Sequence, residues 1–231
     1  MSATPGGYPV AMKRVPEPHV EDSAERAEAY DAKDFSTVNH AFARRLLELG
    51  AKGRVLDIAC GPGHVALQLV AISSKVQVVG VDSSQHMLDI AEEHREVSSH
   101  AERVEFQVAD ANQLPFEDGS FQAVCSKSSL HHMDDPLTYL QEAWRVTEVG
   151  GVLLIRDHYR PETMAEAEAL VEKYGSDRNA SGKATMLAGF CAAYTPDELI
   201  DLAREAGLQG AELEIDNDRH MSLQVAAIKA D

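Results

Sequence analysis

Residues 54–67, with the sequence RVLDIACGPGHVAL, constrain the fold of this chain more than any other stretch. The apolar segment 55–58 is followed by a turn that contains Gly61 and Gly63, and then by an apolar segment that begins at Val65. Glycine lets the backbone turn sharply and approach a ligand closely, because it has no Cβ. A strand, a glycine turn and a helix in this order are typical of a phosphate- or cofactor-binding turn in a parallel α/β sheet.

Further segments have the length and apolar character of buried strands: 76–82, 104–108, 121–127, 152–156, 211–215 and 223–228. Before and between the predicted strands, the spacing of apolar residues predicts helices. One is capped by Ser36 and ended by Gly50, and another runs from Pro136 to the glycine pair at Gly150. A capping box at Thr195 begins a third.

Polar residues stand at the ends of several predicted strands. The loops that leave the carboxyl ends of parallel strands line the ligand site of such a sheet. We therefore expect one edge of the sheet to gather the polar residues at these ends, which are Asp57, Asp82, Asp110, Ser126 and Asp157.

Two long passages carry a family resemblance. The sequence 57–63, DIACGPG, resembles the first motif of class I S-adenosylmethionine-dependent methyltransferases, with Ala59 where many relatives have glycine. The sequence 114–136, LPFEDGSFQAVCSKSSLHHMDDP, resembles the small-molecule branch of that family, typified by ubiquinone-biosynthesis methyltransferases, with Gln122 where those commonly carry Asp. The resemblance covers residues 50–156 by motif and the remainder by architecture.

The resemblance implies a particular α/β fold. It is a Rossmann-like, doubly wound, seven-stranded and mostly parallel sheet whose last strand is antiparallel. N-terminal helices at 21–50 are expected to cover the cofactor. Residues 159–195 are expected to form a helical lid over the substrate, with breaks at the three glycines of that stretch, Gly175, Gly182 and Gly189.

The resemblance also implies a cofactor, S-adenosyl-L-methionine, which leaves as S-adenosyl-L-homocysteine. The residues expected to bind it lie on the N-terminal helices and after the first four strands: Tyr30, Asp57, Ala59, Cys60, Gly61, Pro62, Gly63, Asp82, Ser83, Met87, Asp110, Ala111, Ser126 and Lys127. Asp82 suits a ribose diol, because two carboxylate oxygens match two hydroxyl donors. Asp110 is expected to reach the adenine amine, and Met87 to lie against the adenine or, alternatively, in the core.

The acceptor side carries histidines and charges. Methyl transfer needs an in-line approach, and positioning alone supplies roughly 7–11 kcal/mol in favourable cases. His131 and His158 are the candidate general bases, because imidazole titrates near neutral pH, with packing or orientation as the alternative for each. Candidate substrate contacts are His132, Asp157, Arg160, Arg219 and His220, although salt bridges are the alternative for the two arginines. We expect no metal, because no short motif such as His-x-x-x-His is present.

Composition limits the partners. Lys and Arg total 21 against 38 Asp and Glu, so the formal charge of −17 disfavours nucleic acid and favours a small-molecule substrate. No apolar run approaches the length of a membrane span and no leader is recognisable, so a cytoplasmic protein without membrane contact is expected. Three scattered cysteines indicate neither disulfides nor a metal site.

The expected organisation is a flexible tail at 1–20, rich in Pro and Gly, and a single methyltransferase domain at 21–231. The expected function is methyl transfer from S-adenosylmethionine to a small molecule. A nicotinamide-dependent oxidoreductase is one alternative, which Asp57 and Asp110 disfavour. A regulatory protein that binds the cofactor without turnover is another. The acceptor atom and the oligomeric state are left open by the sequence.

Overall fold

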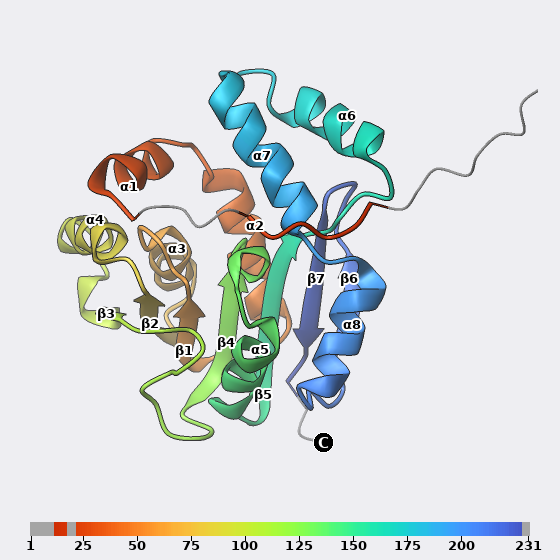
Figure 1. The fold of residues 1–231 in the computed structure, drawn as a ribbon. Coiled ribbons are helices and arrows are strands. Elements are labelled where there is room, and N and C mark those ends of the chain that lie inside the picture. The colour runs from red at the N-terminus through yellow and green to blue at the C-terminus, as the bar shows by residue number, and fades with distance from the viewer. Residues whose placement is uncertain (1–11, 18–21, 228–231) are drawn as a thin grey trace, which may run out of the picture.

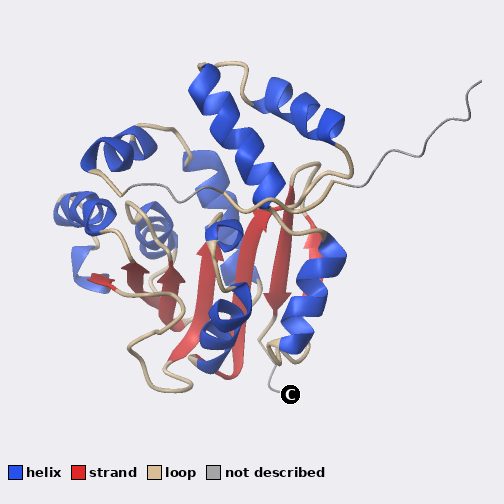
Figure 2. Cartoon of the chain, in the orientation of Figure 1, coloured by secondary structure: helices blue, strands red, loops and turns tan. Residues whose placement is uncertain are grey.

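The computed structural model describes residues 12–17 and 22–227, and they contain a seven-stranded sheet (Figures 1 and 2). Its order is β3-β2-β1-β4-β5-β7-β6. All pairings are parallel except those of β7, which runs antiparallel to both neighbours. The predicted fold class is therefore confirmed. The strands are β1 Gly53–Ile58, β2 Val76–Asp82, β3 Val104–Val108, β4 Phe121–Lys127, β5 Thr147–His158, β6 Glu212–Ile215 and β7 His220–Val225.

Both faces of the sheet are covered by helices (Figure 2). Side chains alternate between the faces along each strand. In β1, Val55 packs with Leu46 and Leu69 on one face, whereas Leu56 and Ile58 pack on the other. The helices α2 Ser36–Glu48 and α3 His64–Ile72 cover the first face, α5 Pro136–Arg145 and α8 Pro196–Glu205 cover the second, and α4 Gln85–Glu96 packs against β2 and β3.

The remaining helices lie above the carboxyl edge of the sheet (Figure 1). They are α1 Ala24–Asp31, at the N-terminal side, and α6 Met164–Tyr174 and α7 Ala180–Ala192, in the predicted lid. Residues 12–17 pass beside the end of α7, where the Val15 amide donates to the Cys191 carbonyl at 2.9 Å and Arg14 Nε to the Ala192 carbonyl at 2.7 Å. The other residues of the predicted tail, 1–11 and 18–20, lie outside the described residues.

The predicted end of the helix at Gly150 is wrong. The helix α5 ends at Arg145, and the chain enters β5 at Thr147. The Phe121 amide donates to the Val146 carbonyl at 3.0 Å, and Thr147 pairs with Phe121 before a shift of register. The glycines therefore mark an irregularity within a strand, at which Gly150 adopts a φ of +78°.

Three smaller predictions are also corrected. Gly182 and Gly189 lie within α7, and of the three lid glycines only Gly175 ends a helix. Ser36 is the first helical residue, and its amide is capped by the carboxylate of Asp34 at 2.9 Å. The last strand begins at residue 220 rather than 223, because β5 extends beyond its predicted end and continues the pairing.

Among the described residues, no helix combines the length and apolarity that a membrane crossing requires.

Gly63 and Gly210 offer a matched test of packing at the glycine turn. Both have positive φ, +76° and +75°. A Cβ on Gly63 would overlap the Phe106 ring, whereas a Cβ on Gly210 would meet nothing within 4 Å. We expect Gly210→Ala to lower the free energy of unfolding by about 1–2 kcal/mol. Gly63→Ala should cost about 1–3 kcal/mol more, because it adds overpacking.

Urea unfolding of the two variants and the parent chain measures this difference. Equal losses for Gly63→Ala and Gly210→Ala would show that the turn tolerates a side chain at its last glycine.

Candidate functional site

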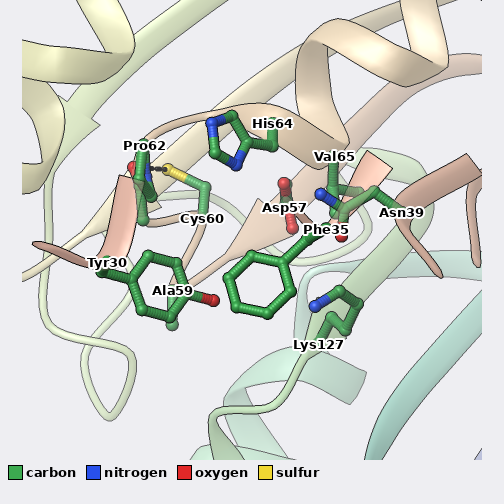
Figure 3. A pocket seen from close by; sticks show the side chains of 11 residues that line it. Tyr30, Phe35, Asn39, Asp57, Ala59, Cys60, Pro62, His64, Val65 and Lys127 are labelled. Carbon is green, nitrogen blue, oxygen red and sulfur yellow. Dashed lines mark hydrogen bonds between the residues drawn. The ribbon is translucent and has the colours of Figure 1, made fainter. Parts of the chain in front are cut away.

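A cleft opens at the carboxyl end of β1, between the glycine turn, the N-terminal helices and β4 (Figure 3). Seven of its lining residues were predicted as cofactor contacts: Tyr30, Asp57, Ala59, Cys60, Gly61, Pro62 and Lys127. Four others were missed: Phe35, Asn39, His64 and Val65. In the sequence, Phe35 directly precedes the predicted helix at Ser36 and Asn39 lies within it, and neither residue belongs to a motif. Their place in the cleft depends on how α2 packs, which no local pattern reveals.

The turn after β1 is held by Asp82. Ala59, Gly61 and Gly63 all have positive φ, of +55°, +54° and +76°. The Gly61 amide donates to Asp82 Oδ2 at 2.8 Å, and the Ser84 amide donates to Oδ1 at 2.9 Å. Asp82 therefore fixes the turn to the end of β2.

Asp57 lies at the base of the cleft and is only 2% exposed. Its Oδ1 accepts a hydrogen bond from the Cys125 thiol at 3.7 Å, but its Oδ2 has no hydrogen-bond partner among the described residues. Burial raises the pKa of Asp57 to about 7, although the Cys125 hydrogen bond and the charge of Lys127 oppose this. A buried carboxylate oxygen without a donor is a ready acceptor for a cationic group of a ligand.

An aromatic wall faces the turn across the cleft (Figure 3). The rings of Tyr30 and Phe35 lie 5.2 Å apart, and the Lys127 ammonium lies 5.4 Å from the Phe35 centroid. A Cβ on Gly61 would come within 3.9 Å of Tyr30 Cε1 and 4.0 Å of Met87 Sδ. The glycine thus leaves a narrow space between these two side chains, and aromatic faces of this kind attract cations.

The remaining predicted cofactor residues do not line this cleft. Asp110 is exposed, and its Oδ1 accepts from the Asn112 amide at 2.8 Å in a turn that also contains Ala111. Ser126 is buried, and its hydroxyl donates to the Ile58 carbonyl at 2.7 Å. Gly63 and Ser83, like Met87, adjoin the turns at the ends of β1 and β2.

Four histidines form a second group at the carboxyl ends of β4 and β5 and the start of β7. We call His131, His132, His158 and His220 the histidine cluster. The ring centroid of His131 lies 3.9 Å from that of His132 and 5.6 Å from that of His158. The ring of His158 stacks on that of His220, with 4.6 Å between the centroids. Phe190 of α7 packs on His158 at 5.1 Å. The topology therefore brings together the predicted base candidates beneath the lid.

Asp157 anchors this cluster. His131 Nδ1 donates to Asp157 Oδ1 at 2.6 Å, the His131 amide donates to Oδ2 at 3.0 Å, and the His158 amide donates to Oδ1 at 2.6 Å. Burial opposes ionisation, yet the charge and hydrogen bonds of His131 hold the pKa of Asp157 well below its usual range. Burial likewise opposes protonation of His131, but Asp157 raises the pKa of His131. Burial lowers the pKa of His158 to about 4 and that of His220 to about 2.

The other predicted substrate residues are engaged within the protein. Arg160 is buried and donates to the carbonyls of Met12 and Ala193 at 3.0 and 2.8 Å and to Glu198 at 2.5 Å. Arg219 lies over the Tyr174 ring at 3.7 Å. His132 pairs through Nδ1 with Glu17, at 2.7 Å.

Comparisons with known proteins agree with this fold. Residues 56–155 match the family described as "Methyltransferase domain". The chain is 35% identical to the 27-O-demethylrifamycin SV methyltransferase of Amycolatopsis mediterranei over 71% of this chain and 57% of that protein. It is 33% identical to the ubiquinone/menaquinone biosynthesis C-methyltransferase UbiE of Geotalea daltonii, over 52% of each chain. It is 32% identical to the O-methyltransferase rstn1 of Aspergillus nomiae over 62% of this chain and 68% of that protein.

A solved structure extends the likeness to three dimensions. A putative methyltransferase from Bacillus halodurans superposes with a TM-score of 0.57 at 29% identity, over 76% of this chain and 71% of that one. The fold and these matches define a class I methyltransferase. The chain belongs to the S-adenosylmethionine-dependent methyltransferase family, as the resemblance implied. It spans about half the length of the first curated relatives that it matches.

Asp57 makes the stability of the protein depend on pH. Its pKa of about 7 exceeds the unfolded value of about 3.9, so the folded state binds this proton more tightly. The stability that the raised pKa of Asp57 contributes is fully present below the unfolded pKa, and it is lost as the pH rises through 7. At pH 8, Asp57→Asn should therefore raise the free energy of unfolding by at most about 4 kcal/mol. The variant should melt several degrees higher, at roughly 2–4 °C per kcal/mol.

Melting curves at pH 5 and pH 8 measure this effect, with the exposed Asp134→Asn as the control. The gain should shrink toward pH 5, while affinity for S-adenosylmethionine falls at both pH values. An equal gain at both pH values would contradict a raised pKa for Asp57.

Proposed function

We propose that this chain transfers the methyl group of S-adenosylmethionine to a small molecule held beside the histidine cluster. The observation that carries the proposal is the buried Asp57 oxygen at the base of the cleft, for which the described part of the chain supplies no hydrogen-bond partner. When bound, the cofactor supplies a methyl group activated by a positively charged sulfur. The side chains around the cleft suit such a ligand, because it has a cationic end and a ribose.

We assign the cofactor contacts as follows. Asp57 accepts from the ammonium of the methionine moiety, and Asp82 accepts from the ribose hydroxyls with the lone pairs that the turn leaves free. Tyr30 and Phe35 cover the sulfonium end, where an aromatic face favours positive charge. Asp110 holds the adenine amine with the adjoining Ala111. The backbone of the turn and the residues next to it complete the site: Ala59, Cys60, Gly61, Pro62, Gly63, Ser83, Met87, Ser126 and Lys127.

The acceptor is activated by His131. Asp157 accepts from Nδ1 and raises the pKa of this imidazole, so the neutral ring keeps its proton on Nδ1 and accepts a proton from the acceptor at Nε2. The Nε2 atom lies beside Gly189 of α7 and Glu17, because a Cβ on Gly189 would lie 3.4 Å from Glu17 Oε1 and 3.6 Å from His131 Nε2. His158 and His220 remain neutral near pH 7, and His158 adjoins His131 in the histidine cluster, as does His132. Arg219 is the cation available to an anionic group of the acceptor.

The organisation and partners follow from this assignment. Residues 21–231 act as one methyltransferase domain, in which 21–50 cover the cofactor and 159–195 cover the acceptor. The formal charge of −17 favours a small molecule over nucleic acid and fits a cytoplasmic protein without membrane contact. The names of two relatives, a 27-O-demethylrifamycin SV methyltransferase and a ubiquinone/menaquinone biosynthesis C-methyltransferase, also refer to small molecules. A nicotinamide oxidoreductase is not favoured, because that chemistry needs no acid at position 57.

A turnover experiment tests the proposal directly. The purified protein is incubated with methyl-labelled S-adenosylmethionine and an extract of its source cells, and small molecules are separated from protein and nucleic acid. Label in a small molecule is the expected result and identifies the acceptor. Label in a macromolecule would overturn the substrate class, and binding of the cofactor without any transfer would favour the regulatory protein instead.

His131 and Asp157 should affect turnover and not cofactor binding. We expect His131→Gln to lower kcat about 10²–10⁴-fold, because a positioned base contributes that much. Asp157→Asn should lower kcat and change its pH profile, because the imidazole loses its charged partner. Both variants should bind S-adenosylmethionine within about twofold of the parent, as isothermal titration would show.

His100→Gln is the matched histidine control, because His100 precedes the 3-10 helix Ala101–Arg103 and does not belong to the histidine cluster. Unchanged kcat in His131→Gln would remove the base from the mechanism and leave positioning alone.

A further inference from the structure

A group of side chains that are able to ligate a metal ion lies beside the glycine turn, away from the histidine cluster. We call it the Asp31 group. It consists of Asp31 at the end of α1, His64 at the start of α3, and His94 in α4. One ligand atom of each lies within 4.8 Å of the others. Three elements that are distant in the sequence therefore present a carboxylate and two imidazoles to one point.

His94 supplies the first argument. Its Nδ1 lies 3.1 Å from the Pro62 carbonyl, which can only accept, so Nδ1 carries the proton. In a neutral ring the lone pair is then on Nε2, which lies 3.4 Å from Asp31 Oδ2. A carboxylate oxygen therefore faces an imidazole nitrogen, and a cation between them, a proton or a metal ion, can join the two. A metal-binding histidine typically donates its other N–H to a carbonyl in this way.

The Asp31 carboxylate supplies the second argument. Its Oδ1 lies 2.8 Å from His64 Nε2, yet this buried oxygen has no hydrogen-bond partner among the described residues. The side chains remain 25–32% exposed, so an ion has access from solvent.

We propose that the Asp31 group binds a divalent cation of the zinc type. Two imidazoles and one carboxylate are donors that Zn²⁺ takes, with a water in the fourth position. A groove of about 470 Å³, which Asp31, His64 and His94 help to line, provides space for that water. The ion joins α1 to α3 and α4. Because Tyr30 precedes Asp31 and lines the cofactor cleft, the ion holds this part of the N-terminal helices against the glycine turn.

The test uses tag-free, chelator-treated full chain titrated with Zn²⁺ alone. We expect the parent chain to bind one equivalent of Zn²⁺ saturably. His94→Gln should bind Zn²⁺ at least about 100-fold more weakly, since loss of even an outer contact costs about 10–100-fold in metal affinity. Asp31→Asn is the second variant, because it preserves the shape of the side chain. Amide exchange in α1 should slow when Zn²⁺ is added to the parent chain but not to His94→Gln.

Glu17→Gln is the matched control, because Glu17, His131 and His132 are another group with metal-ligand spacing among the described residues. Zinc affinity should be unchanged in this variant. The proposal is overturned if the parent chain shows no saturable binding, or if Glu17→Gln loses the ion while His94→Gln and Asp31→Asn keep it. These outcomes do not depend on methyl transfer, so they are independent of the proposed function.

Discussion

The hydrogen bond from the Gly61 amide to the Asp82 carboxylate is the contact on which the cofactor side of the structure depends. It joins the turn after β1 to the end of the neighbouring strand. The turn contains Ala59 in the left-handed region, which costs a residue with a Cβ about 1–2 kcal/mol, so an outside contact must stabilise it. With the turn fixed, Tyr30 packs across Gly61 and Asp57 remains beneath the cleft.

Two buried carboxylates divide the tasks at the sheet edge. Asp157 accepts three N–H groups from His131 and His158, and its charge is compensated within the protein. Asp57 has one oxygen without a donor among the residues that the structure describes, and burial raises its pKa. A buried charge is costly unless it is paired. The unpaired carboxylate is thus suited to receive a cation from a ligand, whereas the paired one is suited to orient a neighbouring imidazole.

Much of this arrangement could be predicted from the sequence, because the first four strands are apolar runs bounded by turns. The polar residues that end them mark the site, since parallel strands present their carboxyl ends at one edge. The start of β5 was missed because its pairing with Phe121 is a tertiary contact. His64 and His94 meet Asp31 from three separate elements, so no motif of fixed spacing could reveal them. Arg160 could be predicted as charged and near the edge, but its partners depend on the path of residues 12–17.

That path links the lid to the rest of the domain. Arg160 is buried, and a buried guanidinium must have its donors satisfied. Its partners come from the N-terminal segment, from the end of α7 through Ala193, and from α8 through Glu198. The base of α7 is therefore fixed to the sheet-covering helices. The C-terminal end of α6 is joined to the β6–β7 hairpin as well, because Lys173 Nζ and Tyr174 Oη each donate to Asp218 at 2.6 Å. The lid is therefore fixed to the rest of the domain at two points, the base of α7 and the C-terminal end of α6.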